Sequence, residues 1–312
     1  MSGGPASEPI VLALRGAGGE PVDLWRTMNS HGFADLPPLR VDPDARTLEL
    51  TLRVPRGRPR RVRIRAGRGA RAAAEVVGGG PVSAAAREAI AAGAAHVLRL
   101  DQDLSGFYAR AAGDPAMAWV TGGAGRMLRS PTVWEDVVKT VSTTNCSWAL
   151  TRKMVQALVR ELGEPAAGHD GDPLANAFPS PGAMAAQPES FYREVVRAGY
   201  RAPNFVRLSQ LAAGGDIDLE RLGAVPRTEM PDEEVERQLL ALPGVGPYAA
   251  AHILMTLGRS SRLILDSWTR PTYAKKVGKR TVSDAAIRRR FRPYGPEAGL
   301  AFWLFVTQDW VS

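Results

Sequence analysis

A glycine hairpin between two helical patterns constrains the fold of this chain more than any other feature. Residues 242–248 read Leu-Pro-Gly-Val-Gly-Pro-Tyr and lie between an acidic amphipathic segment and an apolar, alanine-rich one. The pattern predicts two helices joined by a tight turn, a helix–hairpin–helix. Gly244 and Gly246 allow positive φ and a close approach, and Pro247 suits a first helical turn. Backbone N–H groups around Val245 can then hold one DNA phosphate. The alternative is an ordinary turn between helices.

An aspartate stands at a fixed distance beyond this hairpin. Asp266 lies twenty residues after Gly246, at the end of the apolar run Ile264–Leu265 and before the next helical pattern. The combination resembles the helix–hairpin–helix DNA glycosylase superfamily, whose members carry a Leu-Pro-Gly-Val-Gly hairpin and a catalytic aspartate about that far downstream. The pair Ser267-Trp268 departs from the small residue and histidine that usually follow that aspartate.

The resemblance implies that Asp266 helps to break the bond between deoxyribose and base. Positive charge develops on the sugar as the C1′–N bond breaks, so a fixed carboxylate beneath the ring stabilises the transition state. The base must first leave the stack, at a cost of roughly a few kcal/mol, and enter a pocket shaped for it. In the alternative interpretation, Asp266 is a buried residue or caps the next helix.

Tyr248 occupies the position where bifunctional members of the superfamily carry a Schiff-base lysine. Without that amine we predict a monofunctional glycosylase, which leaves an abasic site without cutting the strand. Tyr248 either faces the DNA, as in thymine- and uracil-mismatch glycosylases, or packs on a helix face. Two alternatives stay open: a non-catalytic helix–hairpin–helix DNA-binding protein, and a glycosylase with weak abasic-site lyase activity.

Two upstream segments are most similar to the 8-oxoguanine and 3-methyladenine glycosylase branch. Residues 130–148 resemble a helix that ends at a DNA-facing asparagine, and Asn145 matches that asparagine. Residues 198–202 resemble a segment in which a tyrosine wedges into the duplex and an arginine holds the orphaned base. Tyr200 and Arg201 take those positions. A flipped nucleotide leaves a hole in the duplex, and such residues fill it.

The residues expected to read the base differ from those of 8-oxoguanine glycosylases. Phe302 replaces a glutamine that contacts the damaged base, and Leu150 replaces an arginine that contacts the opposite cytosine. We therefore expect an aromatic pocket from Phe302 and Trp268 that suits an electron-poor alkylated base or another modified base. Trp303 and Phe305 are expected in the core of a C-terminal helix. The identity of the base and of its opposite partner stays open.

Residues 1–100 are expected to form a β-rich N-terminal module. Short apolar runs alternate there with Gly/Pro turns, and residues 47–54 and 61–65 alternate strictly between apolar and other side chains. These two segments predict a hairpin with one apolar and one charged face. Its arginines, at positions 53, 56, 58, 60, 61, 63 and 65, are interpreted as a solvated face rather than a phosphate-binding one.

Residues 101–312 are expected to form the helical body. A helical pattern spans 131–162, with a break around 143–147, and further helical segments recur to the end of the sequence. The predicted fold class is α+β. The resemblance implies that two helical subdomains flank the DNA cleft.

The net charge of +8 and a pI near 10 suit a protein that meets a phosphate backbone. Only five of the 40 basic residues are lysine, however, and a GC-rich genome produces the same arginine bias without selection for DNA binding. We expect double-stranded DNA as the partner and a monomeric protein. The sequence lacks a secretory signal and a long apolar run, which predicts no membrane contact and a cytoplasmic, nucleoid-associated location.

No cofactor is expected. The lone Cys146 rules out an internal disulfide and a four-cysteine metal site. No metal is required, although hairpins of the superfamily can hold a monovalent cation, here at the carbonyls of Leu242 and Val245.

Overall fold

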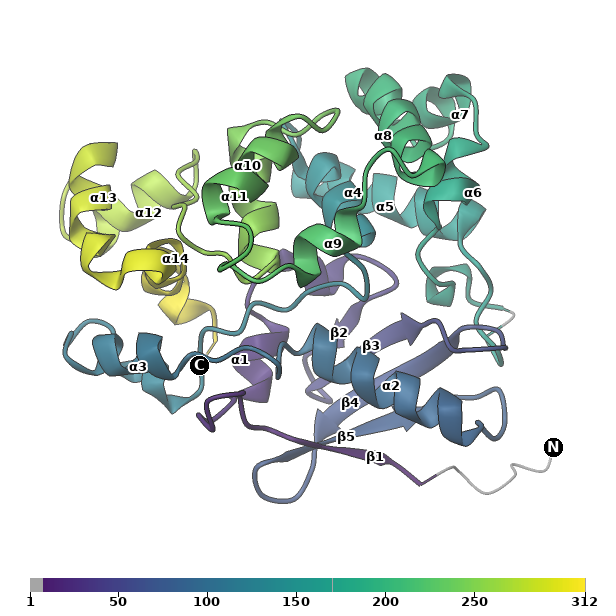
Figure 1. Cartoon of the computed structure of the whole chain (residues 1–312), viewed down its shortest axis with the longest axis horizontal. Helices are drawn as coiled ribbons and strands as arrows, with labels where there is room; N and C mark the ends of the chain where they lie inside the picture. Colours follow the sequence, from purple (N-terminus) through teal and green to yellow (C-terminus); the bar gives the residue numbers. More distant parts are fainter. Residues whose placement is uncertain (1–7, 170, 312) are drawn as a thin grey trace.

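A five-stranded antiparallel sheet forms the N-terminal part of the chain in the computed structural model, which describes residues 8–169 and 171–311. The strand order is β1-β5-β4-β3-β2. The strands are β1 (Ile10–Ala13), β2 (Arg40–Asp42), β3 (Thr47–Leu52), β4 (Arg60–Ala66) and β5 (Arg71–Val76). Helix α2 (Ala84–Val97) packs across the sheet, and its Ile90, Ala94 and Val97 share a core with the strands (Figure 1).

Four of the seven arginines of the β3–β4 hairpin are exposed, as predicted for a solvated face, whereas Arg60 and Arg61 are buried. Arg61 is buried, and both Arg61 and Arg63 pair with Glu49 on β3. The Thr51 hydroxyl donates to the carbonyl of Ala175, which lies in a loop of the helical body. Alternation identifies which residues share a face of a sheet, but it does not tell whether a distant loop covers that face.

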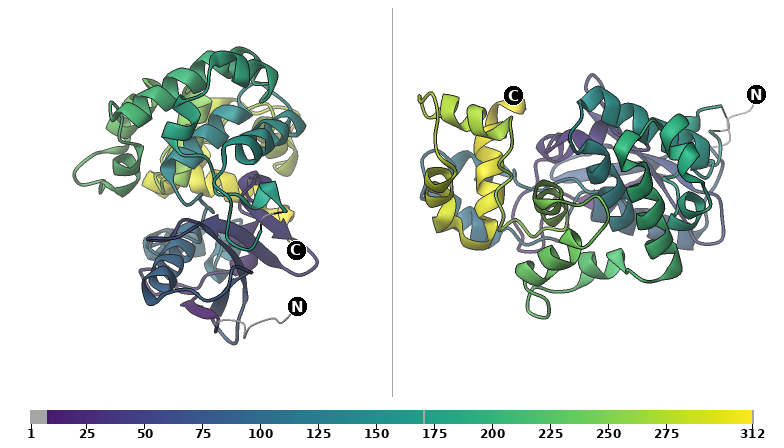
Figure 2. Two further views of the ribbon diagram at one scale, coloured as in Figure 1. Left: turned by 90° about the vertical axis from the view of Figure 1, so that its right-hand side faces the viewer. Right: turned by 90° about the horizontal axis from the view of Figure 1, so that it is seen from above.

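Helices make up most of the remaining chain and lie beside and above the sheet (Figures 1 and 2). Two short ones follow β1, namely α1 (Leu24–Met28) and the 3-10 helix η1 (Gly32–Asp35). The later α-helices are α3 (Ser105–Ala112), α4 (Val133–Thr143), α5 (Trp148–Leu162), α6 (Pro181–Ala185), α7 (Glu189–Glu194), α8 (Ala202–Gly214), α9 (Leu219–Ala224), α10 (Asp232–Leu240), α11 (Pro247–Thr256), α12 (Thr269–Lys276), α13 (Asp284–Phe291) and α14 (Ala298–Thr307). The 3-10 helices among them are η2 (Ala118–Gly122), η3 (Pro173–Ala175), η4 (Gly199–Arg201), η5 (Arg292–Glu297) and η6 (Gln308–Trp310).

The long helical pattern breaks between α4 and α5, as predicted. Asn145 adopts a left-handed conformation, with a φ of 46°. Asparagine tolerates that conformation better than most residues. Ser147 then caps α5, because its side chain accepts the backbone N–H of Leu150. The break places the exposed Asn145 at the end of the otherwise buried α4.

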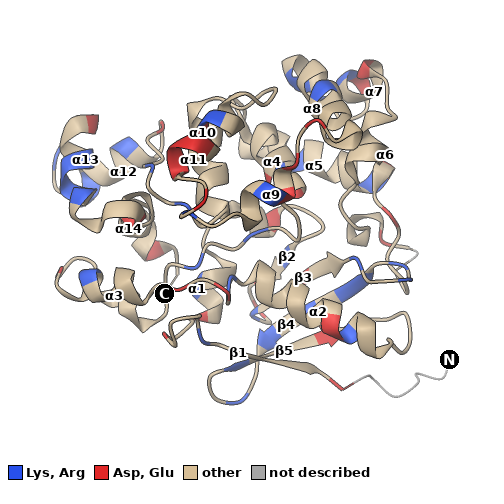
Figure 3. Cartoon of the chain, viewed as in Figure 1, with Lys and Arg blue, Asp and Glu red and all other residues tan. Residues whose placement is uncertain are grey.

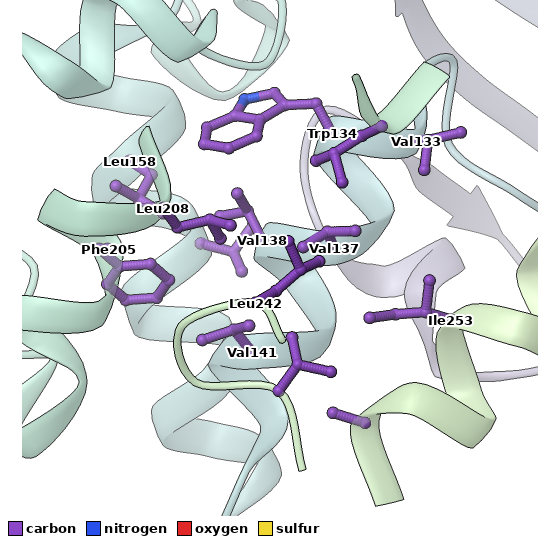
Figure 4. Close-up of a cluster of buried hydrophobic side chains, with 14 of the residues drawn as sticks. Val133, Trp134, Val137, Val138, Val141, Leu158, Phe205, Leu208, Leu242 and Ile253 are labelled. Atoms are coloured by element: carbon purple, nitrogen blue, oxygen red, sulfur yellow. The ribbon is translucent and has the colours of Figure 1, made fainter. Parts of the chain in front are cut away.

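Two apolar cores divide the helical body into two subdomains that share α11. The first core lies among α4–α11, and Figure 4 shows Val138, Val141 and Leu242 of this core packed together. The second core joins α3 to α12–α14. Ile253 of α11 belongs to the first core and Met255 to the second. The predicted α+β class with a two-part helical body is therefore confirmed.

Helix α4 also carries charged side chains into the interior. Lys139 is fully buried, and its Nζ lies 2.6 Å from Glu135 Oε1 and 3.3 Å from Ser130 Oγ. Asp136 accepts the backbone N–H of Ser130. Burial raises the pKa of Glu135, and it raises the pKa of Asp136 to about 6. We call Ser130, Glu135, Asp136 and Lys139 the α4 charge cluster.

Candidate active site

The predicted hairpin joins α10 to α11, and its two glycines serve different purposes. Gly244 has a φ of +81°, and a Cβ atom there would lie 3.1–3.2 Å from Asn204 and Val141. Gly246 is extended, with a φ of −99°, so of the two glycines Gly244 alone uses the positive φ that both allow. It precedes the first turn of α11, and no described atom lies within 4 Å of the position that its Cβ would take. Gly246 therefore leaves the N-terminus of α11 open to a close approach from outside.

The carbonyl proposed as a cation ligand at Leu242 has a role in the turn itself. It accepts the backbone N–H of Val245 at 3.1 Å, which closes the hairpin. A carbonyl oxygen has a second lone pair, so this hydrogen bond does not prevent the Leu242 carbonyl from binding a cation. The cation site at Leu242 and Val245 stays a prediction.

Asp266 lies just before α12 and is held there by the start of that helix. Its Oδ1 accepts the backbone N–H groups of Trp268 at 2.8 Å and of Thr269 at 2.7 Å. Its own N–H donates to the Thr269 hydroxyl at 2.9 Å. Among the described residues, Asp266 Oδ2 has no hydrogen-bond partner. Asp266 thus caps the helix through one oxygen and presents the other to its surroundings.

A cavity of about 450 Å³ opens in front of Asp266. Five separate parts of the chain line it: the loop at η1, the α4–α5 turn, α11, the start of α12 and the C-terminal helices. The lining residues are His31, Gly32, Phe33, Thr143, Cys146, Trp148, Thr151, Tyr248, His252, Asp266, Trp268, Trp303 and Trp310. We call this cavity the aromatic pocket. The described residues that line it include no lysine or arginine.

Aromatic rings form a continuous wall on one side of the aromatic pocket. The ring centroid of His252 lies 4.7 Å from that of Tyr248 and 5.9 Å from that of Trp303. Trp268 continues the wall at 6.1 Å from Trp303, and Trp310 lies 5.3 Å from Trp268. The structure therefore places Trp268 at the pocket, where it was predicted, and Tyr248 beside it.

Phe302 does not belong to the aromatic pocket, and its assignment to the base pocket is wrong. Its side chain is fully buried in the second core, where its ring lies 5.5 Å from Phe291 and 6.1 Å from Tyr273. The next residue, Trp303, faces the pocket instead, and its indole N–H donates to the carbonyl of Ser30. Helix α14 is apolar on nearly every side. Its hydrophobic pattern therefore does not tell which residue faces the cavity.

The sequence did not predict the two histidines of the aromatic pocket, His31 and His252. Burial lowers the pKa of His31 to about 4, and it lowers the pKa of His252 to about 4 as well, so both are neutral near pH 7. His252 could have been found, because it follows Tyr248 by four residues and so lies on the same helix face. His31 could not, because it comes from the loop before η1, far away in the sequence.

The predicted DNA-facing residues come together next to the aromatic pocket. Asn145 Nδ2 donates to the Tyr200 hydroxyl at 3.3 Å, and the Arg201 guanidinium lies 4.5 Å from the Tyr200 ring centroid. Tyr200 is 55% exposed, whereas Arg201 is buried and donates through Nε to the Thr144 hydroxyl. Residues 143 and 146 line the aromatic pocket, so this group, which we call the rim cluster, lies next to that lining.

Charges are distributed unevenly over the helical body. Lys and Arg side chains concentrate on α12 and α13, and acidic ones on α10 (Figure 3). No helix in the described part of the chain is long and apolar enough to cross a membrane. Among the same residues, no group of three His, Cys, Asp or Glu side chains is placed to hold a metal ion.

Solved structures of similar fold are known, although no family model and no curated protein matches the sequence. The 3-methyladenine DNA glycosylase from Archaeoglobus fulgidus has a TM-score of 0.72 and 19% identity, covering 97% of this chain and 100% of that one. The 8-oxoguanine glycosylase/lyase of Clostridium acetobutylicum has a TM-score of 0.70 and 18% identity in its apo form, covering 93% and 94% of the two chains. In complex with double-stranded DNA containing cytosine opposite 8-oxoguanine, it has a TM-score of 0.71 and 17% identity, covering 97% and 96%. Together with the hairpin and the position of Asp266, this likeness shows that the chain has the fold of the helix–hairpin–helix DNA glycosylases.

Proposed function

We propose that this chain is a monofunctional DNA glycosylase that excises a damaged or modified base from double-stranded DNA. The observation that carries the proposal is the hydrogen bonding of the Asp266 carboxylate and its place in the lining of the aromatic pocket. One oxygen is fixed by two backbone N–H groups, and the other faces a deep pocket with aromatic walls. Solved structures of the same fold are named as DNA glycosylases, and one of them contains double-stranded DNA.

The free oxygen of Asp266 is suited to stabilise positive charge on deoxyribose. When the base enters the aromatic pocket, the C1′–N bond breaks, and the bonding electrons leave with the base. The carboxylate stabilises the cationic sugar and orients a water molecule, whose oxygen bonds to C1′. The attacking water loses a proton, to the leaving base when that base is neutral in DNA and to solvent when it is cationic, so the products are the free base and an abasic site. Water and one carboxylate suffice, and the reaction needs no cofactor.

The hairpin and the rim cluster supply the grip on DNA. The open N-terminus of α11 beyond Gly246 can receive a backbone phosphate through the N–H groups around Val245. Tyr200 is exposed enough to enter the space that a flipped nucleotide leaves, and Asn145 and Arg201 hold it in place. The enzyme is proposed to act as a monomer. We place it in the cytoplasm, at the nucleoid.

The aromatic pocket favours an electron-poor base. Aromatic faces attract a cationic or electron-poor ring, because their π-systems carry negative charge on the face. Both histidines are neutral, and the described lining has no lysine or arginine to repel a positive base. A base that carries an alkyl group and a positive charge is therefore the proposed substrate.

Tyr248 supports base removal without strand cleavage. A lyase needs an amine that forms a Schiff base with the sugar, and a phenol cannot do so. Burial raises the pKa of Tyr248, which keeps its hydroxyl protonated near neutral pH. The solved Clostridium acetobutylicum enzyme of this fold is named as a glycosylase/lyase, so lyase activity is the outcome that must be tested.

The test is a single-turnover assay on duplexes that carry a panel of modified bases, worked up with and without alkali. We expect strand breaks only after alkali. Breaks without alkali would establish a lyase. If no base is released from any duplex while wild type and Asp266→Asn bind DNA equally well, the chain is a non-catalytic DNA-binding protein.

A further inference from the structure

His252 is, besides Asp266, a polar residue of the aromatic pocket with unused hydrogen-bonding groups. It lies on the face of α11 that lines the cavity, between the rings of Tyr248 and Trp303. Neither of its ring nitrogens has a hydrogen-bond partner among the described residues. The side chain is only partly buried, so these nitrogens can reach a molecule in the cavity.

Most other polar groups of the lining are already occupied within the protein. The Thr143 hydroxyl donates to Thr140, and the Thr151 hydroxyl donates to Ser142. The Cys146 thiol also donates to the carbonyl of Ser142. Trp148, Trp268 and Trp310 are 37–47% exposed, so water can reach their indole N–H groups. His252, like Asp266, therefore brings to the pocket lining a hydrogen-bonding group that no described residue uses.

The second histidine of the aromatic pocket provides an internal comparison. His31 Nε2 donates to the carbonyl of Leu128, and His31 Nδ1 accepts the backbone N–H of Phe33. Both nitrogens are used, so the tautomer of His31 is fixed and its role is structural. His252 has one N–H donor and one lone pair, and neither is committed.

We infer that His252 is a specificity-determining residue that accepts a hydrogen bond from the exocyclic amine of an extruded alkylated purine. This inference rests on the proposed function. An exocyclic amine projects beyond the ring, so it can reach the wall of the aromatic pocket. Positive charge on an alkylated ring makes that amine a stronger donor. The neutral imidazole can accept this bond, whereas an imidazolium would have no lone pair and would repel the base.

The test compares duplexes carrying 7-methylguanine or 7-methylhypoxanthine, two bases that differ only in the exocyclic amine. Wild type is expected to excise 7-methylguanine at least tenfold faster. His252→Phe keeps a ring between Tyr248 and Trp303 but removes the acceptor, so it should lose about ten- to a hundredfold in rate on 7-methylguanine alone. His252→Gln restores an acceptor and should recover part of the preference.

Two measurements separate recognition of the base from a structural role. Thr121→Val is the control, because Thr121 does not line the aromatic pocket and the hydroxyl that it removes is bonded to the carbonyl of Ala118. It should keep the wild-type preference. Binding of His252→Phe to a duplex with a tetrahydrofuran abasic site should equal that of wild type, because that duplex has no base to read.

The other outcomes would contradict either the role of His252 or the proposed function. If His252→Phe keeps the preference, or loses equal rates on both bases, His252 does not read the amine. If wild type shows no preference for 7-methylguanine but releases another base, this inference fails and the proposed function stands. If wild type releases no base from any duplex, both fail.

Discussion

The aromatic pocket and the α4 charge cluster both hold polar side chains in apolar surroundings, but they treat them in opposite ways. In the α4 charge cluster, Lys139 contacts both Glu135 and Ser130, and Asp136 accepts the Ser130 N–H. In the aromatic pocket, one oxygen of Asp266 and both nitrogens of His252 have no described partner. Satisfied groups stabilise a fold, whereas unsatisfied groups beside a cavity are available to a ligand. Lys139, which is paired within the protein, therefore has a structural role. The position at the aromatic pocket where a catalytic lysine would lie is taken by Tyr248.

Removing the lysine of the α4 charge cluster should give the largest effect, and it should be on stability. Lys139→Met leaves Glu135 buried without its partner, which we expect to cost about 3–5 kcal/mol in the free energy of unfolding. Urea unfolding measures this loss. The exposed pair Arg193–Glu189 is the control, because Arg193→Met should cost about 1 kcal/mol or less. A loss that small in Lys139→Met would mean that the buried pair is not a stabilising unit.

Asp266→Asn should show the reverse: lost activity with preserved stability. Asparagine keeps an oxygen that can accept the N–H groups of Trp268 and Thr269, so the start of α12 should stay intact. The negative charge is lost, and we expect the single-turnover rate to fall by about 10²–10³-fold, or roughly 3–4 kcal/mol. A variant that retains the wild-type rate would remove Asp266 from the mechanism.

Acid should affect the buried histidines and Asp136 with opposite signs. His31, His96 and His252 each have a pKa lowered from 6.5 to about 4. Their contribution to stability is complete above pH 6.5 and is lost as the pH falls towards 4, by at most about 3 kcal/mol each. Asp136, with its pKa raised from 3.8 to about 6, contributes the opposite slope.

The histidines outnumber this aspartate, so the melting temperature should fall between pH 6.5 and 4. Thermal unfolding across that range measures the fall. Asp136→Asn should make it steeper and His252→Phe should make it shallower. Identical slopes in the two variants would show that these groups do not titrate as the structure predicts.

A smaller effect is expected at the rim cluster. Tyr200 is 55% exposed, so Tyr200→Ala should leave stability almost unchanged. Binding to a duplex with an abasic-site analogue should weaken by about 1–3 kcal/mol, because an aromatic stacking contact is lost. Fluorescence anisotropy measures this difference, with Tyr200→Phe as the control that keeps the ring. Equal binding by all three proteins would contradict the role of Tyr200 as a wedge.

The smallest effect should come from Tyr248→Phe. The variant keeps the ring that lies 4.7 Å from His252 and removes only the hydroxyl. A single neutral hydrogen bond contributes about 1 kcal/mol, so the single-turnover rate should change little. A loss approaching that of Asp266→Asn would show that the Tyr248 hydroxyl takes part in the chemistry.

Local patterns predicted the elements that local physics determines. The glycine hairpin, the break at Asn145 and the carboxylate at Asp266 each follow from a few neighbouring residues, and the structure contains all of them.

Long-range packing decided the features that could not be predicted. The side of α14 that faces the aromatic pocket depends on its neighbours, so Phe302 was assigned in place of Trp303. His31 reaches the pocket only because the N-terminal module docks on the helical body. Arg61 of the β3–β4 hairpin is buried for the same reason, since it contacts Thr51, which bonds to a loop more than a hundred residues downstream.

The contact between Trp303 and Ser30 joins residues 273 positions apart, and Gly32 lies so close to Trp148 that a Cβ atom there would be 2.9 Å from the indole. The residues that line the aromatic pocket run from His31 to Trp310, so no short fragment of the chain contains all of them. Closing loops of that length costs entropy that only the complete set of native contacts can offset. We therefore expect the pocket to assemble late in folding, and hydrogen exchange at its backbone amides to require nearly global unfolding. Loss of activity on heating should then coincide with loss of the whole fold.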